Sequence, residues 1–349
     1  MAYTDIDDPT LYFSSTIWTG NGVDDRNIVI DGTGMQPDFV WIKSRNDTDN
    51  HRLVDSVRGA TKHLESDGSG AEQTSSNVKT FTSTGVTLST NGSVNANSEL
   101  YASWSWKAGT SFTNDASATG IGTIDSAGSV NNDSGFSIVS YTGTGSNGTV
   151  KHGLNSVPKM FIVKELSNAN SWEVYHVSQG AGKNAQLNTT AAFESAGSSR
   201  WNSTAPTSSV FSIGTDSGVN RSSSNYIAYC FAEKQGYSKF GSYTGNGNAD
   251  GTFIYTGFKP AFIMIKRTDV AKNWYINDNL RLGYNVNNPY ISPNITAAET
   301  GGTEIDILSN GFKIRASGTG HNQSGGTYIY MAIAENPFVT STGVPATAR

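Results

Sequence analysis

Short apolar runs alternate with polar turns along the whole chain. The runs are about four to six residues long, rich in Val, Ile, Phe and Tyr, and bounded by Gly, Asn, Ser or Pro, which is typical of β-strands. Residues 312–315 follow the turn Asn310-Gly311 and alternate between two faces, as a half-buried strand does. Helical periodicity is confined to two short candidates, residues 54–64 and 191–196. The pattern therefore predicts an all-β protein with little helix.

The same set of motifs occurs three times. Each copy opens on an aromatic-Thr-Gly turn, continues to a proline and an apolar run that ends in lysine, and closes on a tyrosine-rich strand. The opening turns begin at Trp18, Tyr141 and Tyr243, the lysines are Lys43, Lys164 and Lys266, and the closing strands begin at Tyr101, Tyr226 and Tyr328. From the second copy to the third, the turn, the proline and the closing tyrosine each shift by 102 residues (141 to 243, 158 to 260, 226 to 328).

Copies of about 100 residues with many short strands and Gly-rich turns predict antiparallel β-sandwiches of jelly-roll type. We expect three tandem homologous sandwich domains at 13–110, 134–236 and 237–338, with an N-terminal anchor at 1–12, a Ser/Gly/Asn-rich linker at 111–133 and a C-terminal tail at 339–349. Almost no residues separate the second and third copies. We therefore expect those two domains to be rigidly coupled and the first to be freer.

Composition narrows the functional classes. Charged residues are 15% of the chain, below the roughly 25% of an average soluble protein, but aromatic residues are 11%, enough to build a packed core. The net charge is −5 and no Lys/Arg run exceeds two, so we expect no nucleic-acid partner. The N-terminus lacks the features of a signal peptide, no apolar stretch approaches the roughly 18 residues of a membrane span, and the single Cys230 excludes a disulfide framework.

The repeated motifs resemble a domain family of tailed bacteriophages, common in marine and cyanobacterial phages, whose function is unassigned. The resemblance covers nearly the whole chain and rests on residues 18–22, 34–43, 51–60, 237–247, 328–332 and 343–349. It implies a virion structural protein, often labelled a tail or tail-fibre component, without catalytic residues to transfer. Assembly in a bacterial cytoplasm and release on lysis fit the lack of a signal peptide and of disulfides.

Two other functions stay open. Only about a dozen residues precede the first copy, with no extended shaft or coiled coil, so a capsid decoration or head-appendage protein is an alternative. A stand-alone carbohydrate-binding module is a third hypothesis for the function.

Catalysis finds little support in the residues. The five histidines stand in no metal-binding frame, no Gly-x-Ser-x-Gly elbow occurs, and no acidic residue recurs in all three copies. Cys230 lies within an apolar run and is interpreted as a core residue. The oxygen-rich loops 46–50 and 246–251 could suit Ca²⁺, but neither continues to a bidentate glutamate, and we interpret them as tight turns. We therefore predict no enzyme, no cofactor and no metal.

Aromatic residues provide the candidates for ligand binding. A ring stands eight residues after each repeated lysine, at His51, Trp172 and Trp274. Such a ring could stack on a sugar or close the end of a sandwich, and its repetition favours the core role. Unrepeated loop aromatics are better ligand candidates, so we predict that Trp201, Tyr284 and Tyr290 contact a host-surface polysaccharide.

Attachment to other virion proteins is predicted at the N-terminus and in the first copy. Tyr3, Ile6, Leu11, Tyr12 and Phe13 form an apolar cluster too small to fold alone, and Arg52, Arg58 and Lys62 are basic residues specific to the first copy. The simpler interpretation of the N-terminal residues is a disordered tail. The simpler interpretation of the basic residues is an ordinary solvated face. We also expect a homo-oligomer, with a trimer favoured, because avidity multiplies weak contacts and cyclic symmetry closes an assembly.

Overall fold

The chain folds into antiparallel sheets with almost no helix. In this computed structural model, residues 3–31, 34–281, 285 and 289–347 are described. Strands make up 43% of the chain and helices 4%, which confirms the all-β prediction. Within the described residues the helices are single turns: α1 (Gly92–Asn95), α2 (Ala116–Thr119), α3 (Ser217–Asn220) and the 3₁₀ turn η1 (Pro9–Leu11). None of these helices has the length and apolar character that crossing a membrane requires.

The first unit, residues 13–106, stacks a three-stranded sheet on a four-stranded sheet. The larger sheet has the order β1–β9–β3–β4, formed by Phe13–Thr19, Leu100–Trp106, Phe39–Ser44 and Arg52–Asp55. The smaller sheet has the order β2–β8–β7, formed by Arg26–Val29, Gly85–Leu88 and Val78–Thr82. A short ribbon pairs β5 (Lys62–His63) with β6 (Gln73–Thr74).

The second unit, residues 110–232, has the same sheet with strands added at both edges. The core order is β12–β19–β14–β15, formed by Phe136–Thr142, Asn225–Ala232, Pro158–Glu165 and Glu173–His176. One edge is extended by β11 (Ser126–Asn131) and β10 (Thr110–Asn114), and the other by β16 (Lys183–Gln186) and β17 (Glu194–Ser195). The smaller sheet pairs β13 (Gly148–Lys151) with β18 (Val210–Ile213).

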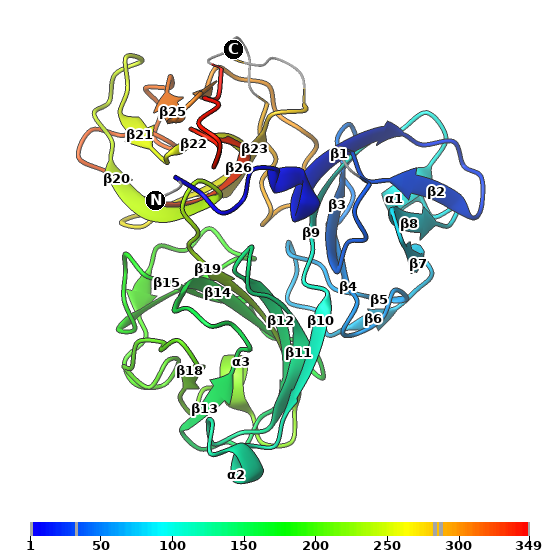
Figure 1. Cartoon of the computed structure of the whole chain (residues 1–349), viewed down its shortest axis with the longest axis vertical. Coiled ribbons are helices and arrows are strands. Elements are labelled where there is room, and N and C mark those ends of the chain that lie inside the picture. The colour runs from blue at the N-terminus through cyan, green and yellow to red at the C-terminus, as the bar shows by residue number, and fades with distance from the viewer. Residues whose placement is uncertain (1–2, 32–33, 282–284, 286–288, 348–349) are drawn as a thin grey trace.

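The third unit, residues 238–337, has the order β20–β26–β22–β23, formed by Ser238–Thr244, Thr327–Pro337, Phe258–Arg267 and Trp274–Asp278. Its smaller sheet has the order β21–β25–β24, formed by Phe253–Tyr255, Gly311–Ile314 and Ile305–Leu308. In each unit the opening strand of the larger sheet pairs with the closing strand, which pairs in turn with the apolar run that ends in lysine. Figure 1 shows the three units as three lobes around a common centre.

Each large sheet is buried on both faces. In β3, Val40 and Ile42 pack inside the first unit, while Phe39 and Trp41 point to the centre of the molecule and join a core shared by all three units. Successive residues of a strand face opposite sides, so a run that is apolar at every position fills two cores. This explains why the repeated runs are continuously apolar and not alternating.

The central core joins the units through aromatic contacts. The Phe39 and Tyr229 rings, of the first and second units, stack with centroids 4.3 Å apart. Phe13 of the first unit meets Phe262 of the third at 5.7 Å, and Phe231 of the second meets Phe240 of the third at 6.4 Å. Since each buried ring removes about 150–250 Å² from water, these contacts fix the first unit against the other two. The expectation that it would be freer is wrong.

Two local expectations also need correction. Residues 111–133 do not form a linker: β10 and β11 pair with each other and continue the sheet of the second unit through β12. The helix expected at 54–64 is instead the end of β4, a turn and β5, and the one expected at 191–196 is a loop that contains β17. Each stretch contains polar residues that pair in short strands, β10 and β11 in the second unit's sheet, β5 with β6, and β17 with β16.

The repeated turn and tyrosine form one packed motif in every unit. In the second unit, Tyr141 of the opening turn stacks on Tyr226 of the closing strand, with centroids 5.1 Å apart and planes 11° apart. Asn220, at the end of α3, accepts a hydrogen bond from Thr144 N (2.7 Å) and donates to Gly214 O (2.7 Å). The corresponding stacked pairs are Trp18–Tyr101 and Tyr243–Tyr328, and the corresponding asparagines are Asn95 and Asn322. These repeated residues therefore maintain the fold of each unit.

Candidate functional site

The three repeated rings join the units in a circle. Trp172 Nε1 of the second unit donates to Glu65 O of the first (2.9 Å), and Trp274 Nε1 of the third donates to Gln186 O of the second (3.0 Å). His51 Nε2 of the first unit donates to Ser292 O of the third, at 3.2 Å. All three side chains are fully buried. The ring position is thus a core and interface position, and none of the three rings is free to stack on a sugar.

A repeated backbone hydrogen bond closes the same three interfaces. It runs from Glu72 N to Leu166 O (3.0 Å), from Phe193 N to Thr268 O (3.0 Å) and from Glu299 N to Arg45 O (2.7 Å). The three bonds link the first unit to the second, the second to the third, and the third back to the first. We call these three interfaces the seams.

The repeated lysines are buried and bonded to backbone carbonyls. Lys164 Nζ donates to Ser69 O across the first seam (3.3 Å), and Lys266 Nζ donates to Thr190 O across the second (3.0 Å). Lys43 donates within its own unit. Desolvation lowers the pKa of each lysine to about 8. A lysine of depressed pKa can act as a nucleophile, but these amines are enclosed and donate to backbone carbonyls, Lys164 and Lys266 across the seams.

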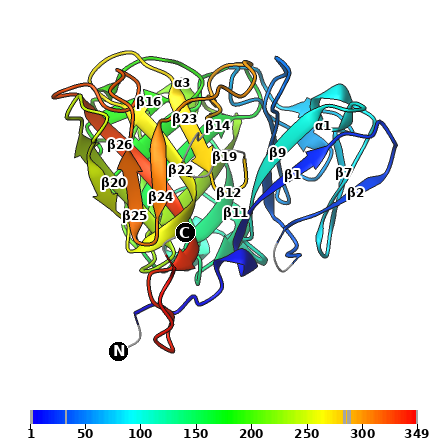
Figure 2. The ribbon, with the colours of Figure 1, turned by 90° about the horizontal axis from the view of Figure 1, so that it is seen from above.

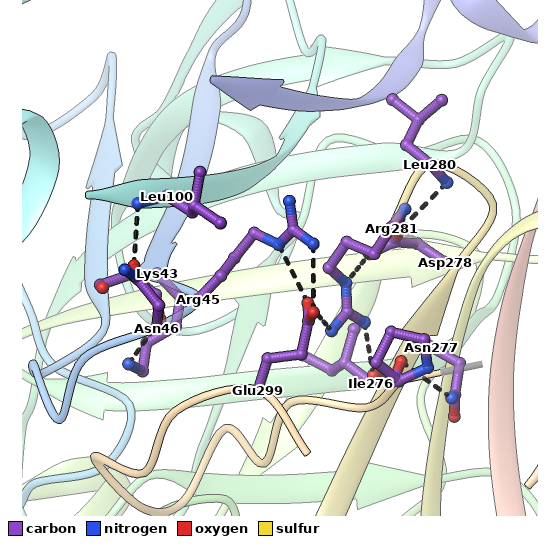
Figure 3. Close-up of polar contacts among 12 residues, drawn as sticks. Lys43, Arg45, Asn46, Leu100, Ile276, Asn277, Asp278, Leu280, Arg281 and Glu299 are labelled. Carbon is purple, nitrogen blue, oxygen red and sulfur yellow. Dashed lines mark hydrogen bonds and ion pairs between the residues drawn. The ribbon is translucent and has the colours of Figure 1, made fainter. Parts of the chain in front are cut away.

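A buried ion-pair cluster closes the seam between the third and first units (Figure 3). Arg281 Nε lies 2.6 Å from Asp278 Oδ2, and Arg281 Nη1 lies 3.2 Å from Glu299. Arg45 of the first unit binds the same glutamate at 3.0 Å, and Trp104 Nε1 donates to Asp278 at 2.9 Å. Burial alone would raise the pKa of Asp278, but the adjacent Arg281 and these hydrogen bonds keep it lowered. The cluster is fully paired, and so it is structural.

The matching cluster at the first seam contains a predicted attachment residue. Arg58 binds Asp55 at 2.5 Å and Glu72 at 3.3 Å, and Tyr229 of the second unit donates to Asp55 at 2.7 Å. The Arg58 side chain is only 3% exposed. A buried guanidinium with these partners is part of the seam, so the structure does not offer it to another protein.

The other predicted attachment residues divide between the interior and the surface. Ile6 and Phe13 are buried, and Tyr12 packs edge-on against Tyr237. Tyr3 is half-buried and donates to Gly257 O at 2.7 Å. Leu11 stays 44% exposed. The apolar cluster is therefore covered by this chain's own third unit, and Figure 2 shows the N-terminal segment running beneath that unit beside the C-terminal tail.

The two remaining basic residues begin two short strands of the first unit, Arg52 in β4 and Lys62 in β5. Arg52 pairs with Glu65 and donates to Ser93 Oγ at 3.0 Å. Lys62 is 39% exposed and donates to Thr74 Oγ1 at 2.7 Å. Of the three basic residues, only Lys62 presents substantial surface.

The predicted binding aromatics are not brought together. Trp201 is fully buried, packs edge-on against Phe161 at 4.9 Å and donates to Lys183 O, so its prediction as an exposed residue is wrong. Tyr290 is half-buried against Tyr275 at 5.0 Å, and Tyr284 lies outside the described residues. Although Trp201 lies in a loop specific to the second unit, its ring fills that unit's own core.

Two exposed aromatics were missed. Among the aromatic residues that the structure describes, only Phe253 (44%) and Tyr255 (53%) are this exposed. They flank the buried Ile254 on β21, so both point away from the sandwich. The alternation Phe-Ile-Tyr on a short strand was the available signal.

An open cleft of about 590 Å³ separates the first and second units. Its floor is a row across the second unit's sheet, where Thr113 lies opposite Ala127 and Ala127 lies opposite Ser140. The remaining lining residues are Val57, Arg58, Glu72, Asn114, Asp115, Asp125, Ser126, Tyr141, Thr142, Leu166, Asn225 and Tyr226. This volume lies within the range of about 300–1,000 Å³ found for small-ligand sites.

Hydroxyl, amide and carboxylate groups line the cleft together with apolar side chains. Thr113, Thr142 and Asn225 are exposed, while the two tyrosine rings are buried beneath the surface. Asp115 caps α2, and Asp125 accepts a hydrogen bond from Ala116 N at 2.8 Å. The cleft can therefore bind a polar ligand, but it offers no aromatic surface for stacking.

Among the described residues, neither an exposed thiol nor a metal-binding cluster lies at the cleft. Cys230 is buried, and desolvation raises the pKa of its thiol far above the usual range. In the portion of the chain that the structure describes, no three His, Cys, Asp or Glu side chains converge as a metal ion would require. The absence of enzymatic activity stays a prediction.

Comparison with known families covers almost the entire chain. Residues 8–337 match a family described as a domain of unknown function, DUF7483. The chain belongs to this family. A search of curated proteins finds no match, so the DUF7483 assignment brings no activity, ligand or partner with it.

Proposed function

We propose that this DUF7483 protein is a non-enzymatic structural protein of a bacteriophage virion, carried on an exterior appendage such as a tail or tail fibre. The observation that carries the proposal is the circle of three seams. The repeated rings and backbone bonds, together with Lys164 and Lys266, hold the units together, as expected of a rigid building block.

The surface properties agree with an exterior position. Only 15% of the residues are charged, and many of these residues pair with one another. A surface with charges of both signs, well mixed, limits non-specific adhesion. Several of the motifs that resemble phage virion proteins contribute to the stacked turns, through Trp18, Tyr243 and Tyr328, and to the seams, through His51.

A capsid decoration or head-appendage protein is the rival function, because a compact three-lobed body could also lie across neighbouring capsid subunits. A stand-alone carbohydrate-binding module is the third.

In the proposed role the partners are other virion proteins, and the assembly is a homo-oligomer with a trimer favoured. Sedimentation at micromolar concentration should then give about three times the chain mass of 37.1 kDa.

Localisation on particles tests the proposal. Gold-labelled antibodies against the purified protein should decorate the tail or its fibres in electron micrographs. Labelling spread over the capsid would replace the appendage role with decoration, and particles without the protein would overturn both.

The N-terminal attachment hypothesis is tested by Leu11→Glu, because Leu11 is exposed and its replacement leaves the buried Ile6 and Phe13 in place. Incorporation at the wild-type level would refute it.

A further inference from the structure

We propose that the cleft between the first and second units binds a neutral, polyhydroxylated saccharide chain. The inference rests on the proposed function only for the source of the saccharide, which would be the surface of the host. Binding itself is a property of the isolated protein, and it can be measured without particles.

The position of the cleft is the first argument. One wall comes from the loop of the first unit that carries Arg58 and Glu72, and the floor includes β10 and β11, which extend only the second unit's sheet. β10 and β11 depart from the repeated pattern, whereas Arg58 and Glu72 have counterparts in Arg281 and Glu299 of the third unit. Additions to a rigid β-scaffold are where binding residues concentrate, and here such an addition meets the wall of a neighbouring unit.

The lining is suited to sugar hydroxyls and to the C–H faces of sugar rings. Thr113 presents a hydroxyl from the floor, and beside it Thr142 Oγ1 donates to Asn225 Oδ1 at 3.1 Å, so this pair presents a hydroxyl oxygen and an amide NH2 group. Val57, Leu166 and Ala127 supply apolar surface beside them. A concave site with a few converging polar groups beside apolar surface is the usual form of a small-ligand site.

Charge selects among polar ligands. Glu72, Asp115 and Asp125 line the cleft against the single cation Arg58, which is already paired with Asp55. The excess of carboxylates repels phosphate, sulfate and acidic sugars. Asp115 and Asp125 already accept backbone N–H bonds at α2. Fewer of their carboxylate lone pairs are therefore available to a cationic ligand. A neutral ligand with many hydroxyl donors fits best.

The exposed rings of Phe253 and Tyr255 are the competing site for a saccharide. They stand on β21, a three-residue strand at the edge of its sheet, and neither ring lines the cleft. The Tyr255 hydroxyl lies 3.4 Å from the Tyr3 hydroxyl. Exposed rings on a sheet edge, outside a concave site, give weak specificity, so the cleft is the better candidate.

A glycan array of neutral and acidic bacterial oligosaccharides, probed with the full chain, tests the proposal, and titration calorimetry with the best neutral hit follows. Thr113→Trp fills the cleft from an exposed strand position, and Asn225→Ala removes the amide. Thr80→Trp, at an exposed strand position of the first unit outside the cleft, is the matched control. Thr113→Trp should weaken binding by about tenfold or more, and Thr80→Trp should leave it unchanged.

Each other outcome is decisive. Loss of binding in Phe253→Ala/Tyr255→Ala, with Thr113→Trp unaffected, would move the site to the rings and overturn the assignment. Binding of hexalysine in place of the oligosaccharides, with an affinity that falls steeply between 50 and 500 mM salt, would show a cationic ligand instead. No binding to any neutral glycan also overturns the proposal, whereas absence of the protein from virions would overturn only the proposed function.

Discussion

Three buried histidines are held in the neutral form by the same pair of hydrogen bonds. In each ring Nδ1 accepts a bond and Nε2 donates one to a backbone carbonyl. Protonation would break the accepted bond and place a charge in the interior. Burial therefore lowers the pKa of these groups from 6.5 to about 3 or 4; they are His51, His152 and His176.

These histidines predict a loss of stability in mild acid. Because the pKa of His176 in the folded chain, about 4, lies below 6.5, the unfolded chain binds more protons between these values, and stability falls as the pH drops through that window. The loss is about 2 kcal/mol for each group between pH 7 and pH 5. Urea titrations of the wild type and of His176→Gln at both pH values check this. The variant should lose about 2 kcal/mol less than the wild type, and an unchanged pH dependence would refute the account.

A glycine of the repeated turn gives a second prediction at the residue scale. A Cβ at Gly143 would lie 2.3 Å from Arg221 O, so Gly143→Ala must displace backbone and should cost about 1–3 kcal/mol. Gly92, in α1, has no atom within 4 Å of the same position, and Gly92→Ala should be neutral or slightly stabilising. Chemical denaturation of both variants compares them directly, and equal stabilities would contradict the packing described.

At the scale of elements, the apolar runs predicted the strands well, because continuous Val, Ile and Phe leave little alternative to a buried strand. Residues 111–133 were misread because Ser, Gly and Asn usually mark loops. Here Ile124 and Val130 are buried and supply enough apolar contact for an added edge. Trp201 was misread because a ring in an unrepeated loop carries no periodic signal that distinguishes a core position from an exposed one.

The added edge makes a prediction of its own. β11 lies between β10 and β12 with both of its edges paired. Its amides should therefore exchange with solvent deuterium about as slowly as those of β12. Hydrogen–deuterium exchange read by mass spectrometry over residues 126–131 and 136–142 makes the comparison. Exchange of 126–131 at the rate of an unstructured peptide would restore the linker interpretation.

At the scale of the whole molecule, the sequence repeat predicted three units with a similar pattern of strands but not their closure into a circle. The signal was present in the apolar runs, since Phe39-Val40-Trp41-Ile42 has no polar face and so requires a core on each side. The sequence could not show which partner covers the second face, because that depends on contacts between distant units. Likewise, the cleft arises where the first unit's loop meets the second unit's added strands, and no single segment encodes it.

Closure into one body is the central claim, and differential scanning calorimetry of the intact chain tests it most directly. Three units that share one aromatic core and three seams should melt together. We expect a single transition whose calorimetric and van't Hoff enthalpies agree, a result that is uncommon for a chain of 349 residues. Separate transitions, with the first unit melting independently of the other two, would contradict the account.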